Sequence, residues 1–220
     1  LGHPPRRWHS PCSAMFAVLP AVQSFSPPAA TSTPPPAKDK AAYARWMMGT
    51  FTWGFLSTTS TRSDGTAVGK PFGNPYGVAD VDGVPCFYGS SLDASFTDIF
   101  GKGGSPLATL ALSEASVQLA NGSASAPACQ IGNAAALGDP ENPPCARLVL
   151  TGTMVNKTGD AAAEAALFKR HPYFAKLPKD HDFFAATLNV TGVWLIDFYG
   201  GAAIIDPADY FAAKAPPAAL

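Results

Sequence analysis

The stretch FKRHPYFAKLPKDHDFFAATLNVTGVWLIDFYGG, residues 168–201, decides the fold of this chain. Its first residues continue a helix that ends at Arg170-His171-Pro172, because a proline disfavours helical geometry in the residue before it. Residues 182–198 are rich in β-branched and aromatic side chains and predict two strands or one long bent strand. A double glycine then breaks the strand. We therefore expect a helix beside a sheet in this part of the chain.

Short strands and short helices alternate along the rest of the chain from residue 38 onward. Tyr43, Met47 and Phe51 recur at every fourth position and predict the apolar stripe of a helix, and Asp82-Gly83 favours a tight hairpin turn. Helices are expected at 38–51, 91–100, 161–169 and from 207, strands at 53–59, 76–81, 85–89, 107–113, 146–157 and 203–205, and a loop at 71–75. About seven strands in this order predict a mainly β protein with peripheral helices (α+β), built on a small closed β-barrel.

Length and composition limit the classes of function. At 220 residues the chain is long enough for one well-buried domain. Its formal net charge of -1 provides no electrostatic footprint for nucleic acid. Charged residues make up 14% of the chain, below the roughly 25% usual in soluble domains, which fits a glycosylated, dimeric or assembly-buried protein. Apolar runs fall short of the roughly 20 residues that a membrane-spanning helix needs, so we expect no transmembrane segment.

The first 40 residues differ in composition from the rest. They hold nine of the 22 prolines, their one acidic residue is Asp39, and basic residues precede a short apolar run. This composition is typical of a targeting segment, either secretory or plastid. The alternative is a disordered linker that carries no targeting signal. We therefore divide the chain into an N-terminal arm or targeting remnant (1–40), a barrel domain (41–213) and a C-terminal tail (214–220).

Three motifs follow one another along the chain, and their order is informative about the family. They are Trp53-Gly54 with the Ser/Thr-rich residues after it, Val84-Pro85-Cys86-Phe87-Tyr88, and the 168–201 stretch. Their order and spacing resemble the CREG glycoproteins, a family among the FMN-binding split barrels of the pyridoxamine-phosphate-oxidase type. The similarity covers residues 41–211. It implies a split β-barrel of the FMN-binding type that pairs into a homodimer through a barrel face. It also implies a protein that does not work as a flavin oxidase.

Cys129 and Cys145 stand where CREG proteins carry a cysteine pair ahead of the central strand. The residues between them are mostly Gly, Asn, Ala, Asp and Pro, which cannot make a core. A disulfide around a loop of this length removes roughly 3 kcal/mol of denatured-state freedom and requires an oxidising compartment. Two free thiols are the alternative, and the pairing of Cys12 and Cys86 stays open. Because the histidines do not cluster with cysteine in the sequence, no metal site is expected.

Asn121, Asn156 and Asn189 satisfy the N-x-Ser/Thr rule for glycosylation acceptors. Their number alone is weak support, but Asn156 and Asn189 fall where CREG proteins carry such triplets. Glycosylation and a disulfide both require the secretory route. We therefore expect an extracellular location or a vacuolar or lysosomal lumen, with a plastid as the alternative.

A flavin mononucleotide site needs basic side chains, hydroxyls and helix N-terminal amides for its phosphate. In split-barrel oxidases these groups come from the part of the chain that corresponds here to residues 53–112. The basic residues in that part are Arg62, Lys70 and Lys102, and all three lie in expected turns. The remaining candidates lie in or just before the helix expected at 91–100: Ser90, Ser91, Ser95, Thr97 and Asp98.

Asp98 departs from the flavin-binding pattern. Flavin-binding relatives tend to have a neutral asparagine there, whereas a carboxylate opposes a phosphate by like charge. The hydroxyls have a simpler interpretation as helix caps. We therefore expect a degenerate flavin pocket at these five residues and no cofactor, with bound FMN as the alternative.

Other candidates for catalysis are few. His171 can act as a general acid or base, but no nucleophile is paired with it, and a histidine before proline is more typical of a helix C-cap. Asp197 is a functional candidate only if it is buried. The alternative is a structural role, either at an edge position or in a satisfied hydrogen bond. The tryptophans Trp46, Trp53 and Trp194 are assigned to the core or an interface. We predict no catalytic residue.

Three hypotheses of function remain. The first is a CREG-like non-catalytic secretory or lumenal glycoprotein that acts as a dimeric binding or scaffold module. The second is an FMN-dependent oxidoreductase of the pyridoxamine-phosphate-oxidase class. The third is an accessory subunit of a large assembly, held through the proline-rich arm. The scarcity of basic residues around the flavin site argues against the second, so the sequence favours a protein that is not an enzyme.

Overall fold

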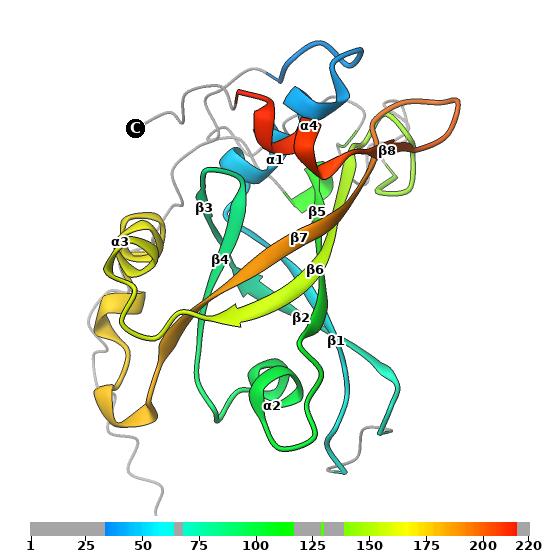
Figure 1. The fold of residues 1–220 in the computed structure, drawn as a ribbon. Coiled ribbons are helices and arrows are strands. Elements are labelled where there is room, and N and C mark those ends of the chain that lie inside the picture. Colours follow the sequence, from blue (N-terminus) through cyan, green and yellow to red (C-terminus); the bar gives the residue numbers. More distant parts are fainter. Residues whose placement is uncertain (1–33, 64–67, 117–128, 130–138, 215–220) are drawn as a thin grey trace, which may run out of the picture.

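The computed structural model describes residues 34–63, 68–116, 129 and 139–214. In these residues the strands form one antiparallel, curled sheet in the order β2-β1-β5-β6-β7-β4-β3, with β8 beside β7 (Figure 1). The strands are β1 (Trp53–Thr59), β2 (Pro71–Gly77), β3 (Ala79–Val81), β4 (Val84–Gly89), β5 (Leu107–Ser113), β6 (Arg147–Asn156), β7 (Phe184–Ile196) and β8 (Ala203–Ile205). The helices are α1 (Lys40–Thr50), α2 (Ala94–Phe100), α3 (Ala161–Arg170) and α4 (Pro207–Ala212). Helices α1 and α4 lie together at one end of the sheet, α2 lies at the other end, and α3 lies at its side (Figure 1).

Alternation of apolar residues along the strands buries the inward face of the sheet, because successive side chains of a strand point to opposite faces. Leu110 and Leu112 of β5 pair in register with Leu150 and Leu148 of β6, and Leu148 pairs with Leu195 of β7. All of these side chains are buried. The inward face of the three central strands therefore forms the barrel core.

The apolar stripe predicted for the first helix covers one end of this core. Tyr43, Met47 and Phe51 are all buried. The C-terminal end of α1 has no basic residue of its own. Arg170 of α3 supplies one, because its Nη2 donates hydrogen bonds to the carbonyl oxygens of Gly49 (3.0 Å) and Phe51 (3.1 Å). A cation near the C-terminal carbonyls of a helix is favourable, so the 168–201 stretch fastens α1 to the barrel.

Residues 71–75, which were expected to form a loop, are the first part of β2. β2 is an edge strand that pairs with β1 alone, and Pro75 pairs in register with Phe55. A proline cannot donate a hydrogen bond to a neighbouring strand, and an edge strand tolerates this because part of its N–H groups face away from the sheet. The loop prediction was wrong because pairing with β1 outweighs the local preference of proline and glycine for turns.

The other elements agree closely with the predictions, with two further differences. The strand expected at 76–81 is divided between the end of β2 and β3. Helix α2 begins at Ala94 rather than at Ser91, because Asp93 is its N-cap and not a residue of its first turn. The 182–198 segment forms one long strand, β7, with a register shift against β6 beside Gly152. A side chain at Gly152 would clash with the carbonyl oxygen of Asn189, so the shift requires glycine.

Candidate functional site

Asp98 is one of the five residues predicted for the flavin site, but its carboxylate binds the end of β1 and the segment that follows it. Asp98 is 0% exposed. Its Oδ1 accepts hydrogen bonds from the Thr61 backbone N (2.9 Å) and from Arg62 Nε (3.2 Å), and its Oδ2 accepts one from Thr58 Oγ1 (3.2 Å). Burial raises the pKa of Asp98, but the bonds from Thr61 and the charge of Arg62 outweigh burial and hold the pKa below its usual value. Asp98 therefore fastens α2 to the end of β1.

The three basic residues of this region do not converge on one phosphate site. The Arg62 guanidinium contacts Asp98 and also lies over the Phe72 ring, 4.5 Å from its centroid. Lys70 and Lys102 are exposed residues of two separate turns, as the sequence predicted. The guanidinium closest to the candidate site is therefore already engaged by an anion and a ring.

The hydroxyl candidates contact mainly the nearby chain. Ser90 Oγ accepts a hydrogen bond from the Leu92 backbone N (3.3 Å). Thr97 Oγ1 donates to the Ser91 carbonyl oxygen (2.9 Å). Ser95 is fully buried on α2. These bonds stabilise the turn that leads into α2, so the hydroxyls of Ser90 and Thr97 have local structural roles.

A second carboxylate, Asp93, occupies the N-terminal end of α2, where a phosphate would need unpaired amides. Its Oδ1 accepts a hydrogen bond from the Phe96 backbone N (3.0 Å) and another from the Tyr76 hydroxyl. Burial, and then the bond to Asp93, raise the pKa of Tyr76. Carboxylates of the chain therefore bind the N-terminal end of α2, through Asp93, and the Arg62 guanidinium, through Asp98.

His171 caps helix α3, as the sequence predicted. Its backbone N donates to the Leu167 carbonyl oxygen (2.7 Å). Its ring stacks on Phe174 with 4.8 Å between the centroids, and Nε2 lies 3.0 Å from the Val78 carbonyl oxygen. Burial lowers the pKa of His171 and outweighs the opposing hydrogen bond to Val78. The C-cap interpretation is confirmed, and a neutral imidazole fits these contacts.

The alternation that builds the core ends in two buried carboxylates. The inward positions beyond Leu112 of β5 and Leu195 of β7 are Glu114 and Asp197, which are 1% and 8% exposed. Ala146 lies just before β6, and its carbonyl oxygen accepts a hydrogen bond from the Glu114 backbone N (2.9 Å). The sequence raised Asp197 as a candidate only if buried, and did not single out Glu114. The register of three strands brings both carboxylates into one layer at the end of the barrel.

Helix α1 supplies partners for both carboxylates. Lys40 Nζ lies 2.5 Å from Asp197 Oδ1. The Tyr43 hydroxyl donates to Glu114 Oε1 (2.7 Å), and the Ala146 backbone N donates to Glu114 Oε2 (3.2 Å). Burial is the largest influence on Glu114 and raises its pKa above the ordinary value, although these two hydrogen bonds oppose it. We call Glu114, Asp197, Tyr43 and Lys40 the polar layer.

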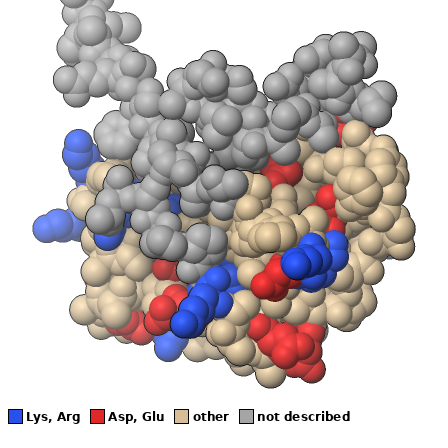
Figure 2. Space-filling view, turned by 90° about the horizontal axis from the view of Figure 1, so that it is seen from above, with Lys and Arg blue, Asp and Glu red and all other residues tan. Residues whose placement is uncertain are grey.

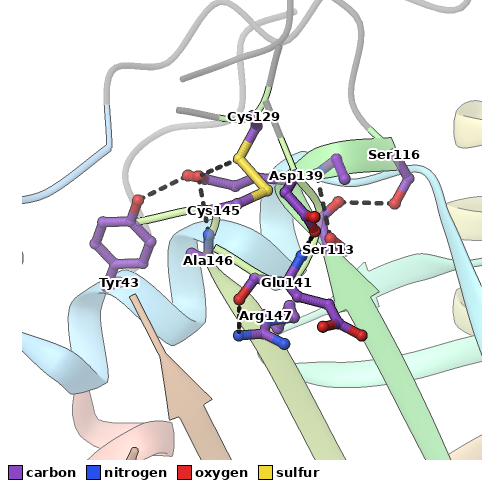
Figure 3. Close-up of a disulfide and its surroundings, with 11 residues drawn as sticks. Tyr43, Ser113, Ser116, Cys129, Asp139, Glu141, Cys145, Ala146 and Arg147 are labelled. Atoms are coloured by element: carbon purple, nitrogen blue, oxygen red, sulfur yellow. Dashed lines mark hydrogen bonds between the residues drawn. A yellow bond between two sulfur atoms is a disulfide. The ribbon is translucent and has the colours of Figure 1, made fainter. Parts of the chain in front are cut away.

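The Cys129–Cys145 disulfide closes over the polar layer. Figure 3 shows the bond beside Tyr43 and Ala146. The two Cα atoms are 5.0 Å apart and both cysteines are buried. Cys129 Sγ lies 3.5 Å from Glu114 Oε2. Of the other cysteines, Cys86 is a buried free thiol on β4, and Cys12 lies outside the described residues.

Replacement of both Cys129 and Cys145 by alanine is expected to lower the free energy of unfolding by about 3 kcal/mol. The unfolded chain regains the freedom of a loop of this length when the bond is absent. Chemical denaturation of the wild-type and double-alanine proteins, with the bond verified by mass before and after reduction, measures the difference. An unchanged free energy of unfolding would show that the bond does not constrain the unfolded chain.

The outward face of the sheet carries a row of apolar side chains. Pairing in register joins Phe55, Ala111, Val149, Trp194 and Ile204 across β1, β5, β6, β7 and β8. Phe55 is 48% exposed and Ile204 is 79% exposed, while the other three are partly buried. We call these five residues the outer apolar row. Periodicity along one strand does not predict it, because each member comes from a different strand.

Two of the three predicted glycosylation acceptors lie on the described surface. Asn156, at the end of β6, is exposed, and its Oδ1 accepts hydrogen bonds from the Thr158 backbone N (2.8 Å) and Thr158 Oγ1 (2.6 Å). Asn189 is exposed in the middle of β7. Asn121 lies outside the described residues. A glycan on Asn156 or Asn189 would therefore project into solvent.

The described surface carries charges of both signs. Figure 2 shows basic and acidic side chains interspersed among other residues on the end that carries α1 and α4. A search of the described residues finds no group of three His, Cys, Asp or Glu side chains that could hold a metal ion. Within the same residues, no helix is long and apolar enough to cross a membrane.

Sequence comparison identifies relatives along most of the chain. A family model described as "CREG, beta-barrel" matches residues 35–212. Protein CREG1 of Gallus gallus is 32% identical over 212 residues, which cover 92% of this chain and 96% of that protein. Protein CREG1 of Homo sapiens is 33% identical over 184 residues, which cover 80% of this chain and 76% of the human protein.

Structural comparison agrees on the fold. A heme binding protein from Mycobacterium smegmatis superposes with a TM-score of 0.61 at 22% identity, and the match covers 84% of this chain and 64% of that longer chain. A general stress protein 26 relative from Clostridium acetobutylicum, of the pyridoxinephosphate oxidase family, gives a TM-score of 0.51 at 10% identity over 78% of this chain and 98% of its own. Identities this low bear on the fold alone, and they confirm the predicted split β-barrel of the FMN-binding type. The family model and the relatives at 32% and 33% identity show that the chain belongs to the CREG β-barrel family.

Proposed function

We propose that this chain is a non-catalytic CREG-like glycoprotein that acts as a dimeric binding or scaffold module with a degenerate flavin pocket. One observation carries the proposal. The Asp93 carboxylate accepts a hydrogen bond at the N-terminal end of α2, and the Asp98 carboxylate pairs with the Arg62 guanidinium. An FMN phosphate placed here would be repelled by the Asp93 carboxylate and would compete with Asp98 for the Arg62 guanidinium. The geometry therefore supports a pocket that has lost its phosphate site, and we assign no catalytic residue.

Two features support a secretory route, ending outside the cell or in a vacuolar or lysosomal lumen. Asn156 and Asn189 are exposed acceptors, and we propose glycans on both and on Asn121. The Cys129–Cys145 disulfide belongs to an oxidising compartment. A plastid location would leave the acceptors unmodified, so the mass of the mature protein separates the two addresses.

The outer apolar row supports a homodimer. Ile204 and Phe55 expose large apolar side chains at the two ends of the row. A two-fold pair would place this row against its own copy, as the isologous contact of a symmetric dimer requires. Burial of apolar surface contributes about 25 cal/mol per Å², so pairing of the row would stabilise a dimer. Asn189 lies five positions from Trp194 along β7, and its glycan would then stand beside the interface.

Replacement of Ile204 by glutamate is expected to weaken the dimer by about 10- to 100-fold, because a charge would be buried in an apolar contact. Sedimentation equilibrium over a range of protein concentrations measures the dissociation constant. Leu92→Glu is the matched control, since Leu92 is 72% exposed on the turn before α2, away from the outer apolar row. Equal dissociation constants for Ile204→Glu and wild type would contradict this choice of interface.

One native mass measurement, combined with an absorption spectrum, tests the proposed function. We expect a dimer whose mass falls after glycosidase treatment, with no flavin mass and no visible flavin band. A yellow protein carrying one FMN for each chain would overturn the non-catalytic proposal in favour of an oxidoreductase of the pyridoxamine-phosphate-oxidase class. A larger complex that deletion of residues 1–37 dissolves would instead favour an accessory subunit held by its arm.

A further inference from the structure

The contact between Glu114 and the disulfide is attractive only if Glu114 carries a proton. Glu114 Oε2 lies 3.5 Å from Cys129 Sγ. A sulfur in a disulfide carries no hydrogen, so it can accept a weak hydrogen bond but cannot donate one. An ionised carboxylate is also only an acceptor, and two acceptors at this distance do not attract each other. A protonated Glu114 can donate its O–H to the sulfur, so the contact favours the neutral acid.

The other two contacts of Glu114 suit the protonated form equally well. Glu114 Oε1 accepts a hydrogen bond from the Tyr43 hydroxyl (2.7 Å). Glu114 Oε2 accepts one from the Ala146 backbone N (3.2 Å), and a carboxyl oxygen that carries a proton still has a lone pair for this bond. A neutral Glu114 carboxyl would therefore join α1, the start of β6 and the disulfide.

The charges around Glu114 also favour its neutral form. The titratable groups that face it from the described elements are Tyr43 on α1 and Asp197 after β7, and Lys40 of α1 is paired with Asp197. Lys40 lies against Asp197, so an ionised Glu114 would leave one uncompensated negative charge in the polar layer. Arg147 lies on the outward face, where its Nη2 donates to the Glu141 carbonyl oxygen (3.0 Å). Burial and the charge of Asp197 raise the pKa of Glu114 in the folded protein.

We propose that Glu114 is a proton-operated latch, whose protonated carboxyl holds α1, the start of β6 and the disulfide together in acidic solution and whose ionisation loosens them as the pH rises. In the unfolded chain Glu114 titrates at its ordinary value. Between that value and the higher one in the folded protein, the folded state binds more protons, so stability falls as the pH rises. The latch rests on the polar layer, Ala146 and the disulfide, and it does not depend on dimer formation, glycosylation or flavin binding.

Thermal unfolding of the full-length, disulfide-bonded protein from acidic to neutral pH tests the latch, with Glu114→Gln as the variant. Glutamine keeps an acceptor for Tyr43 and stays neutral at every pH. We expect the melting temperature of the wild type to fall relative to that of Glu114→Gln by about 3–5 °C for each pH unit within the window. Glu141→Gln, which removes an exposed carboxylate from the neighbouring turn, is the matched control and should keep the wild-type slope.

Carbon-13 NMR of the Glu114 carboxyl in the wild type provides a second readout that does not need a variant. Titration of this carboxyl at the ordinary glutamate value would overturn the latch, as would equal pH slopes for wild type and Glu114→Gln. Two double variants, each compared with the wild type, test the role of the Cys129 sulfur. In Cys129→Ser/Cys145→Ser a hydroxyl can donate to an ionised Glu114, whereas Cys129→Ala/Cys145→Ala has no donor. The latch predicts the highest pKa for Glu114 in the wild type, a lower one in the alanine pair and the lowest in the serine pair. A wild-type pKa no higher than that of the alanine pair would contradict the proposed O–H···S contact.

Discussion

Replacement of Asp98 by alanine is expected to lower the free energy of unfolding by about 3–5 kcal/mol, because loss of one partner leaves a buried ion without its counter-charge. The Arg62 side chain is 15% exposed and would lose its carboxylate. The Thr61 amide and the Thr58 hydroxyl would lose their acceptors. Urea denaturation, followed by tryptophan fluorescence, measures the change.

Asp98→Asn is the matched control, because it keeps an oxygen acceptor and removes the charge. We expect it to cost about 1.5–3 kcal/mol, the range for a hydrogen bond to a charged group. The pKa of Asp98 is lowered in the folded protein, so its stabilisation is present above the ordinary aspartate value and is lost as the pH falls through the lowered value. Asp98→Asn should lose this acid dependence. Equal stabilities for wild type and Asp98→Ala would refute the structural role assigned to the carboxylate.

The wild type and Asp98→Asn also test the alternative that the chain binds FMN. Asp98→Asn removes the anion that engages Arg62, and it introduces the neutral residue that flavin-binding relatives tend to carry. If this single carboxylate were what excludes FMN, the variant would acquire flavin while the wild type remains colourless. We expect neither protein to bind FMN, because Asp93 still occupies the N-terminal end of α2.

Replacement of Arg45 by methionine is expected to lower the free energy of unfolding by about 3–5 kcal/mol, as for other broken buried ion pairs. The Arg45 side chain is 6% exposed, and its Nη1 lies 3.2 Å from Asp80 Oδ1 on β3. Its guanidinium also lies 5.3 Å from the centre of the Tyr210 ring on α4. Methionine would fill part of the space and leave the Asp80 carboxylate without its cation. Chemical denaturation measures the loss.

A double-mutant cycle with Asp80→Asn isolates the ion pair from the packing of the Arg45 side chain. Asparagine keeps an acceptor for the Gly83 backbone N, which bonds to Asp80 Oδ1 at 2.6 Å. For groups in direct contact, the coupling energy is expected to be about 0.5–3 kcal/mol. A coupling energy of zero would mean that Arg45 acts through its contact with Tyr210 and not through the ion pair with Asp80. Arg45→Lys should fall between the wild type and Arg45→Met, because lysine keeps the charge but not the planar group.

Local patterns predicted most of the elements correctly. The repeat of Tyr43, Met47 and Phe51 identified α1, and all three residues are buried. The proline after His171 marked the end of α3, where His171 is the C-cap. Strands β5 and β8 have the predicted bounds. These features depend on neighbours a few residues apart, which is the range over which the propensity and periodicity of a sequence act.

The candidate site was predicted less completely, because its main contacts join distant parts of the chain. Asp98 was expected to repel a phosphate, but it is buried and bound to Arg62, a residue assigned only to a turn. Lys40 and Asp197 are 157 positions apart, and Glu114 lies 71 positions from Tyr43. No periodicity spans such separations. The local signs of the polar layer were charged residues that continue the inward alternation of a strand, Glu114 after Leu112 and Asp197 after Leu195.

The sequence by itself determined most of the elements and the family, and the family implies the split-barrel fold. Helix caps, apolar stripes and ordered motifs each depend on short stretches of sequence, such as residues 168–201. The tertiary structure alone decided which charges meet, which strand lies at the edge and which apolar residues form the outer apolar row. Residues 71–75 became a strand because β1 offered a partner. The polar layer formed because the end of β5, the start of β6 and the end of β7 lie in register. Strand pairing is a non-local choice, and its register assigns each side chain its neighbours.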